Sequence, residues 1–317
     1  MKICIKIIIC ITFFLPLKVC SSFLLEDIEL FGTDVKKELI TKHIPLCFGQ
    51  TYDIASLAAS FDALACAQKL KNILNVYAVK CMFVFYPNTQ KAYLSIDVVE
   101  HQDKEKVSFR PTPTSVVAWE NERLVALYNQ FFKRLSDLLR SGNNIAEDLS
   151  KHYLDYEDAE LHSVVKELIK LVPGYKANLL AIIKFDKDGN KRAIAAHLLN
   201  WVMVDLQDVI KEIIPCLDDE NSNVRNNIAR FIMYHTKHVE LQEIRYTFID
   251  YLLMQLNKPY HSDRNKALYN LLSLAENFDD CKAYIKLKGL GSIQSIAQTS
   301  ILENILEPAQ KLLTLCQ

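Results

Sequence analysis

Residues 190–199 read NKRAIAAHLL, and the same pattern returns as NVRNNIARFI at 223–232 and as SDRNKALYNL at 262–271. Aligned on Arg192, Arg225 and Arg264, the segments are 33 and 39 residues apart. A residue that favours a helix N-cap stands two positions before each arginine, and small or apolar residues stand three, four and seven positions after it. A pattern that recurs in register at this period predicts pairs of helices stacked on one another.

The three segments resemble HEAT repeats, whose second helix opens with an arginine of this kind. The stretch from Ala267 to Leu315, which contains KGLGSI at 288–293, is similar to an armadillo repeat. Apolar stripes at helical spacing precede the repeats, at Leu124, Leu127, Tyr128, Phe131, Leu135 and Leu138, and at Leu161, Val164, Val165, Leu168 and Ile169. Residues 116–317 are therefore predicted to form an all-α helical-repeat solenoid.

The composition favours helices and argues against a nucleic-acid binder. The 317 residues include only 7 Gly and 9 Pro, whereas average usage gives roughly 22 and 16. Apolar residues make up 50% of the chain and charged residues 24%, which excludes a disordered chain. The formal net charge is −1, without the basic excess that nucleic-acid binding needs.

Residues 23–101 combine strand-like alternation of apolar residues with helical spacing, unlike the repeats. They predict a small α+β domain with the order β-α-α-β-β. The first strand is Ile28–Gly32, and a helix follows over Val35–Ile44. Asp53 is the predicted N-cap of a second helix, after a turn at 49–52. Two alternating strands, 76–86 and 92–100, surround a turn at 87–88.

This order resembles a polypeptide-transport-associated (POTRA) domain. The matching residues are Gly32 at the end of the first strand, Gly49 and Tyr52 in the turn, and the segments 75–77 and 98–100. The resemblance implies a periplasmic module that guides unfolded polypeptides or docks partners. It also implies that the first strand of the hairpin lies at the edge of the sheet. The charged and proline-bearing residues 102–115 are predicted to be a semi-rigid linker.

Residues 1–22 have the pattern of a signal peptide. Lys2 and Lys6 precede an apolar run over 7–15, and small residues allow a cut after Ser21. The alternative is an uncleaved membrane anchor, which would be the chain's membrane contact. None of the nineteen Asn residues lies in an N-x-Ser/Thr sequon. We therefore expect an exported protein, periplasmic or secreted, with a bacterial cell envelope favoured.

Six cysteines remain after such a cut. An even number in an exported chain permits disulfides, while the alternative is that they are buried small hydrophobic residues. No two are closer than fifteen residues, which excludes a CxxC redox motif or a zinc knuckle. They are Cys47, Cys66, Cys81, Cys216, Cys281 and Cys316.

The predicted contact residues fall into three groups. The edge strand for extended peptides is represented by Val76, Tyr77, Val79, Lys80, Met82 and Val84. The solenoid-face contacts are His197, Arg230 and Asn270, five or six positions after the aligned arginines. Arg192, Arg225 and Arg264 are interpreted as structural, with Arg225 paired to a turn carboxylate such as Asp219. The alternative is that the three arginines bind an anion.

We expect a non-enzymatic, exported scaffold that binds a protein or an extended peptide. No nucleophile, phosphate-loop or metal motif is present in the sequence, so no catalytic residue, cofactor or metal is predicted. No nucleic-acid partner is expected. The alternative function is a chaperone cofactor of a secretory compartment, because the C-terminal part loosely resembles armadillo-type nucleotide-exchange factors. A third class is a hydrolase whose site the sequence does not reveal.

Overall fold

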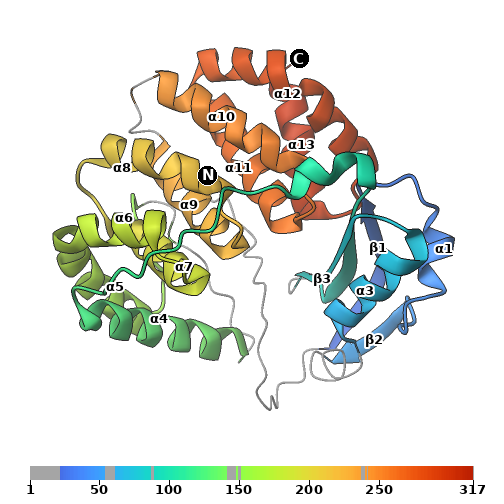
Figure 1. The fold of residues 1–317 in the computed structure, drawn as a ribbon, viewed down its shortest axis with the longest axis horizontal. Coiled ribbons are helices and arrows are strands. Elements are labelled where there is room, and N and C mark those ends of the chain that lie inside the picture. The colour runs from blue at the N-terminus through green and yellow to red at the C-terminus, as the bar shows by residue number, and fades with distance from the viewer. Residues whose placement is uncertain are drawn as a thin grey trace.

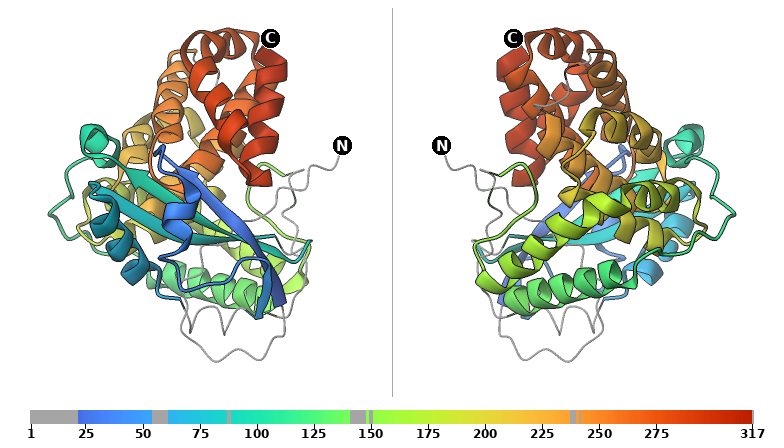
Figure 2. Two further views of the ribbon diagram at one scale, coloured as in Figure 1. Left: turned by 90° about the vertical axis from the view of Figure 1, so that its right-hand side faces the viewer. Right: turned by 90° about the vertical axis from the view of Figure 1, so that its left-hand side faces the viewer.

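The computed structural model describes residues 22–53, 61–86, 89–140, 148, 151–236, 240 and 242–316. Residues 1–21 of the predicted signal segment, the start of the predicted second helix and the 87–88 turn lie outside these ranges, whereas Ser22 is described and extended. A small sheet lies beside a larger helical body, which we define as residues 122–316 (Figures 1 and 2). This confirms the coarse part of the predicted fold class, a small sheet-containing region followed by a mostly helical body. None of the described helices is long and apolar enough to cross a membrane.

The sheet is mixed and has the order β2-β1-β4-β3. β1 is Ser22–Phe31, β2 is Gln50–Asp53, β3 is Ala78–Tyr86 and β4 is Lys91–Val99. β1 runs parallel to β4 and antiparallel to β2, and β3 pairs antiparallel with β4. β3 is therefore an outer strand of the described sheet, the position that the POTRA resemblance implied for it.

The sheet has a fourth strand because residues 50–53 are extended. We predicted a turn here, but only Gly49 turns, with a φ of 77°, and the next residues pair with β1. Asp53 belongs to β2 and not to a helix N-cap. Asp62 caps the described helix α3 (Ala63–Leu74) by accepting from the backbone of Leu64 and Ala65. The helix α1 (Lys37–Thr41) is shorter than predicted.

The alternation of the strands creates two covered faces. Leu25, Ile28, Leu94 and Ile96 form a core with α3. The other face carries Val84 and Tyr86, which belong to the core of the helical body. Gly32 ends β1 with a φ of 79°, and a Cβ there would lie 2.3 Å from the Val98 carbonyl oxygen, so only glycine fits.

The helical body is a succession of stacked helices. Three helices that open with the repeat arginines, α7, α9 and α11, pack against one another in order, and α13 packs on α11. Helices α6, α8, α10 and α12 form the partner layer. The bounds are α4 Glu122–Arg140, α5 Ala159–Leu171, α6 Lys176–Phe185, α7 Gly189–Leu198, α8 Leu206–Ile213, α9 Ser222–His235, α10 Gln242–Leu256, α11 His261–Asn277, α12 Asp279–Thr299 and α13 Glu303–Cys316.

Short 3-10 turns join several of these elements. They are η1 His101–Val107, η2 Val172–Tyr175, η3 Leu199–Trp201 and η4 Ile214–Asp218. The repeat helices begin two residues earlier than predicted. Asp188 and Asn221 cap α7 and α9 with their side chains, four positions before the arginines.

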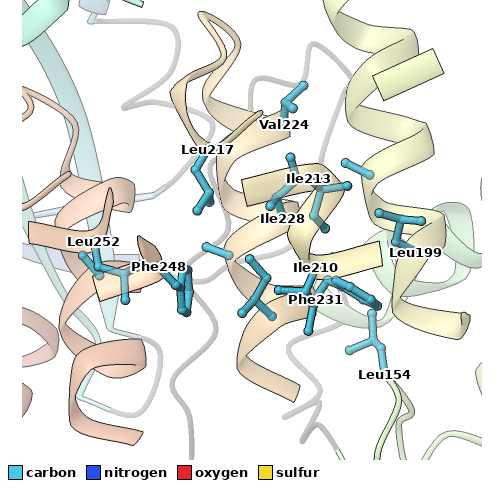
Figure 3. Close-up of a cluster of buried hydrophobic side chains, with 14 of the residues drawn as sticks. Leu154, Leu199, Ile210, Ile213, Leu217, Val224, Ile228, Phe231, Phe248 and Leu252 are labelled. Atoms are coloured by element: carbon cyan, nitrogen blue, oxygen red, sulfur yellow. The ribbon is translucent and has the colours of Figure 1, made fainter. Parts of the chain in front are cut away.

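Apolar side chains from neighbouring layers fill the body. Ile210 of α8, Phe231 of α9 and Phe248 of α10 are almost fully buried in one cluster (Figure 3). The predicted stripes on α4 and α5 also face this core, with Leu124, Phe131 and Leu161 inaccessible to solvent. This continuous packing is the source of most of the body's stability.

The predicted linker packs against the helical body. After η1 the chain is extended over residues 108–120, which we call the strap. Figure 1 shows the strap crossing the body on its way to α4. As the chain advances along the strap, its contacts move from Lys258 to Asp218 and then to Asp186. The strap therefore passes the repeats in reverse order.

Candidate functional site

The repeat arginines are joined in a ladder, defined as Arg192, Arg225 and Arg264 with their carboxylate partners. Arg192 donates through Nε and Nη2 to the two oxygens of Asp219, at 2.8 and 2.7 Å. Its Nη1 donates to the carbonyl oxygen of Asp186, six residues earlier, at 2.9 Å. The guanidinium thus binds the turn before its own helix and the turn of the next repeat.

The next two arginines repeat this geometry. Arg225 binds Asp263 at 2.7–2.8 Å and donates to the carbonyl oxygen of Asp219 at 2.6 Å. Arg225 lies in the first turn of α9, as predicted, but its carboxylate partner is Asp263 and not Asp219. The carboxylate comes from the next repeat because the guanidinium points along the stack.

Arg264 extends the ladder into the sheet. Its Nη2 donates to Asp97 of β4 at 2.6 Å, and its Nη1 donates to the carbonyl oxygen of Lys258, again six residues earlier. Asp97 therefore occupies the place that an aspartate of a following repeat would take. The sheet is joined to the stack as if it were the next repeat.

The ladder is closed to solvent. All three arginines are fully buried, and each already holds a carboxylate. All three guanidinium groups are therefore used in contacts within the fold, and their structural role stays a prediction.

The strap covers the ladder from one side. Arg110 donates to Asp219 at 2.6 Å and to the carbonyl oxygen of Ile183 at 2.8 Å. The backbone amide of Val117 donates to Asp186 at 2.9 Å. Burial alone would raise the pKa of Asp219, but hydrogen bonds from Arg192 and Arg110 lower it below its ordinary value. Asp219 is held ionised by both the stack and the strap.

Aromatic rings and cations meet where the strap, the sheet and α11 join. The Tyr260 ring lies between Lys80 of β3, at 3.7 Å, and Arg225, at 4.5 Å from its centroid. Phe109 of the strap has Lys258 4.1 Å above its ring. These cation–π contacts tie one end of β3 to the body.

Buried polar groups line the rest of the boundary between the sheet and the body. Glu29 of β1 accepts hydrogen bonds from Ser300 Oγ at 2.5 Å and from the Ile301 and Leu302 amides before α13. Tyr86 of β3 binds Asn304. Burial raises the pKa of Glu29 and of Asp97, opposed by Ser300 in the first case and by Arg264 in the second.

The predicted edge strand is only partly accessible. Val76 precedes the strand and is buried, and Val84 is inaccessible because it packs in the helical core. Both are corrections to the predicted contact set. Tyr77, just outside β3, is 42% exposed. Val79, Lys80 and Met82 lie within β3 and are half-buried.

Two of the three predicted solenoid-face residues are buried. His197 is packed among Tyr128, Phe132 and Trp201, with ring centroids 4.9–5.5 Å away, because α4 covers this end of the stack. Burial lowers the pKa of His197 to about 3, helped by Arg230. Asn270 is inaccessible and donates to the carbonyl oxygen of Lys266 at 2.8 Å. Only Arg230 remains half-exposed.

Asn270 was misplaced by one position. Counting five residues from the arginines aligns Arg230 with Tyr269, and Tyr269 is half-buried, whereas Asn270 points inward. The partly exposed side of α9 and α11 contains polar and aromatic residues that we call the inner face. They are Asn227, Arg230, Tyr234, Lys266 and Tyr269.

No protein family model matches the chain. No curated protein matches it either. Among solved structures, a designed armadillo repeat protein is similar to it, with a TM-score of 0.38 and 14% identity over 63% of this chain and 97% of that one. Within the described ranges, His, Cys, Asp and Glu do not gather in a group of three that could hold a metal ion.

Proposed function

We propose that this protein is an exported, non-enzymatic scaffold that binds extended polypeptide at the outer edge of β3. The observation that carries the proposal is the place of β3 at the end of the sheet order β2-β1-β4-β3. An outer strand offers backbone N–H and C=O groups to an added strand, and such bonds tolerate many sequences.

The surroundings of β3 support this use. The strand is nine residues long, whereas the opposite outer strand β2 has four. β3 has no proline, and Lys80 is its one charged residue. Prolines and several charges are what usually protect an outer strand from pairing. A long outer strand with no proline and a single charge is therefore suited to pairing with another chain.

The helical body supplies a second surface. The inner face on α9 and α11 carries two basic residues and two tyrosines that are partly exposed. Helical repeats bind partners along extended faces of this type. We propose that polypeptide held at β3 is contacted there by side chains.

The proposal of export follows from the signal-like residues 1–22 and from the POTRA resemblance. That resemblance implied an outer position for the first strand of the hairpin, and β3 has this position. β2 is an addition to the expected strand order. A cell-envelope role in guiding or docking polypeptides remains part of the proposal.

Paired proline variants test the edge. Neighbouring residues of a strand point their N–H groups to opposite sides, so one of Met82→Pro and Phe83→Pro removes an outward donor and the other removes a bond to β4. The outward variant should keep a melting temperature near that of the wild type and lose binding to an array of extended peptides.

Thr51→Pro is the matched control, because it places proline in the opposite outer strand β2. It should bind the peptide array as the wild type does. If both β3 variants keep wild-type binding while folded, β3 is not the site. If Arg230→Ala alone abolishes binding, the inner face is the site instead.

A further inference from the structure

Two cysteines meet between α3 and β3. Cys66 lies in the second turn of α3, on the side that packs against the sheet. Cys81 lies in β3 opposite Ile96, on the face that α3 covers. Both side chains are buried, with 6% and 7% of their surface exposed. They are fifteen residues apart in the chain.

The two thiols belong to one cluster of buried side chains between α3 and β3. The neighbouring Cys81 thiol lowers the pKa of Cys66, whereas the Cys66 thiol together with burial raises the pKa of Cys81. Cys66 is therefore the better nucleophile of the pair.

The remaining described cysteines are placed elsewhere. Cys47 is exposed just before β2, where its backbone N–H donates to the Tyr52 hydroxyl oxygen. Cys216 lies in η4 against Arg110, while Cys281 and Cys316 lie in α12 and α13. Cys66 and Cys81 thus form a separate pair in the small domain.

We propose that Cys66 and Cys81 form a disulfide bond that links α3 to β3 in the exported protein. The geometry that carries this proposal is the placement of two buried cysteines on the facing sides of α3 and β3, which pack against each other. An oxidising compartment is the place where such a bond forms and persists. The inference goes beyond peptide binding and does not depend on it.

The oxidant is a disulfide, either of a protein or of a small thiol. The Cys66 thiolate attacks one sulfur of that disulfide, which forms a mixed disulfide and releases one thiol. Cys81 then loses its proton and its sulfur displaces the second thiol from Cys66. The two cysteines lose two electrons and two protons in total, and the oxidant is reduced to two thiols.

The bond would fasten the proposed edge strand. β3 is joined to β4 on one side only, and the link to α3 would hold it in place when the outer edge is engaged. Closing the 66–81 loop also restricts the unfolded chain, which raises the stability of the small domain.

Non-reducing peptide mapping of the full chain tests the proposal. The chain is refolded with oxidised and reduced glutathione, and a linked peptide containing Cys66 and Cys81 is expected, lighter by two hydrogens than the free pair. Unlinked peptides, or a link from either cysteine to a different one, would overturn the proposal.

Thermal unfolding provides the second readout. The oxidised protein should melt at a higher temperature than the same sample treated with dithiothreitol, by about 5 °C or more. Cys47→Ser, which removes an exposed thiol, should keep both the linked peptide and the shift. Cys66→Ser/Cys81→Ser should melt at the same temperature with and without reductant. A shift that persists in this double variant would assign the effect to other cysteines.

Discussion

Single arginines determine how the repeats are joined. Their recurrence and their structural role could be predicted from the sequence, because the helix pattern around them repeats. Their partners could not be predicted. Asp263 and Asp97 lie beside the arginines because the repeats and the sheet pack together, and distance along the sequence does not reveal this. Asp97 looks like an ordinary outward residue of an alternating strand, yet it is buried against Arg264.

Replacing Arg225 with alanine should destabilise the protein strongly. The change leaves Asp263 buried without a cation, and the loss of one partner of a buried pair costs about 3–5 kcal/mol. The free energy of unfolding from denaturant titration measures this. Arg123→Ala removes an exposed pair with Glu167 and should cost no more than about 1 kcal/mol. Similar losses in both variants would contradict a structural ladder.

The buried histidine at position 197 should make the fold sensitive to mild acid. Burial lowers the pKa of folded His197 to about 3, whereas an unfolded histidine titrates near 6.5. Below pH 6.5 the unfolded state binds a proton that the folded state does not. Stability should therefore fall with decreasing pH, by about 1.4 kcal/mol per pH unit for this residue.

Denaturant titrations of the wild type and the variant His197→Phe between pH 5 and 7 check this slope, because Glu29 and Asp97, whose pKa burial raises, contribute alike to both proteins. His197→Phe should flatten it, and His261, whose pKa burial and Arg264 also lower to about 3, contributes to the slope that remains. An unchanged slope in His197→Phe would show that this histidine is protonated in the fold.

At the scale of elements, helices were easier to predict than the added strand. A helical stripe such as that of α4 is visible over many residues, so its buried side followed from spacing alone. β2 has only four residues, and its extended shape comes from pairing with β1, which the local sequence does not reveal. Pro308 inside α13 is tolerated because the Asn265 side chain donates to the Asn304 carbonyl that the proline leaves free.

The two glycines of α12 should respond differently to alanine. A Cβ at Gly291 meets nothing within 4 Å, so Gly291→Ala should gain about 0.8–1.0 kcal/mol from helix propensity. A Cβ at Gly289 would lie 2.4 Å from Leu253 Cδ2 of α10. Gly289→Ala should therefore be less stable than Gly291→Ala in denaturant titrations. Equal gains would mean that the Leu253 side chain moves aside without cost.

The whole molecule behaves as one packed unit in its contacts. The sequence predicted a sheet, a spacer and a helical body, and it could not predict that the spacer lies on the ladder. It also could not predict that Val84 and Tyr86 belong to the helical core. These contacts join residues that are far apart in the chain, and no local pattern encodes them.

Asp97→Ala should therefore weaken both parts together. In the variant the buried Arg264 has lost its carboxylate partner, and Glu29 is 3.9 Å away. The free energy of unfolding should fall by about 3–5 kcal/mol. Hydrogen exchange should show the same loss of protection in β4 and in α11. Glu26→Ala, which removes a partly exposed pair with Lys91, is the control and should change protection in neither element. A loss confined to β4 would show that the sheet unfolds alone.

The strap has a consequence for the timing of synthesis. Residues 108–120 leave the ribosome before every helix that they contact, and Ser108 meets Lys258 only 150 residues later. The Glu29 carboxylate can accept its hydrogen bonds from the Ile301 and Leu302 amides only after these later residues have been synthesised. Contacts of such long range delay folding, so an incomplete chain should stay in a form without these tertiary contacts. Ribosome-bound chains that end before residue 258 should be cleaved readily by protease, and resistance at that length would contradict this order of assembly.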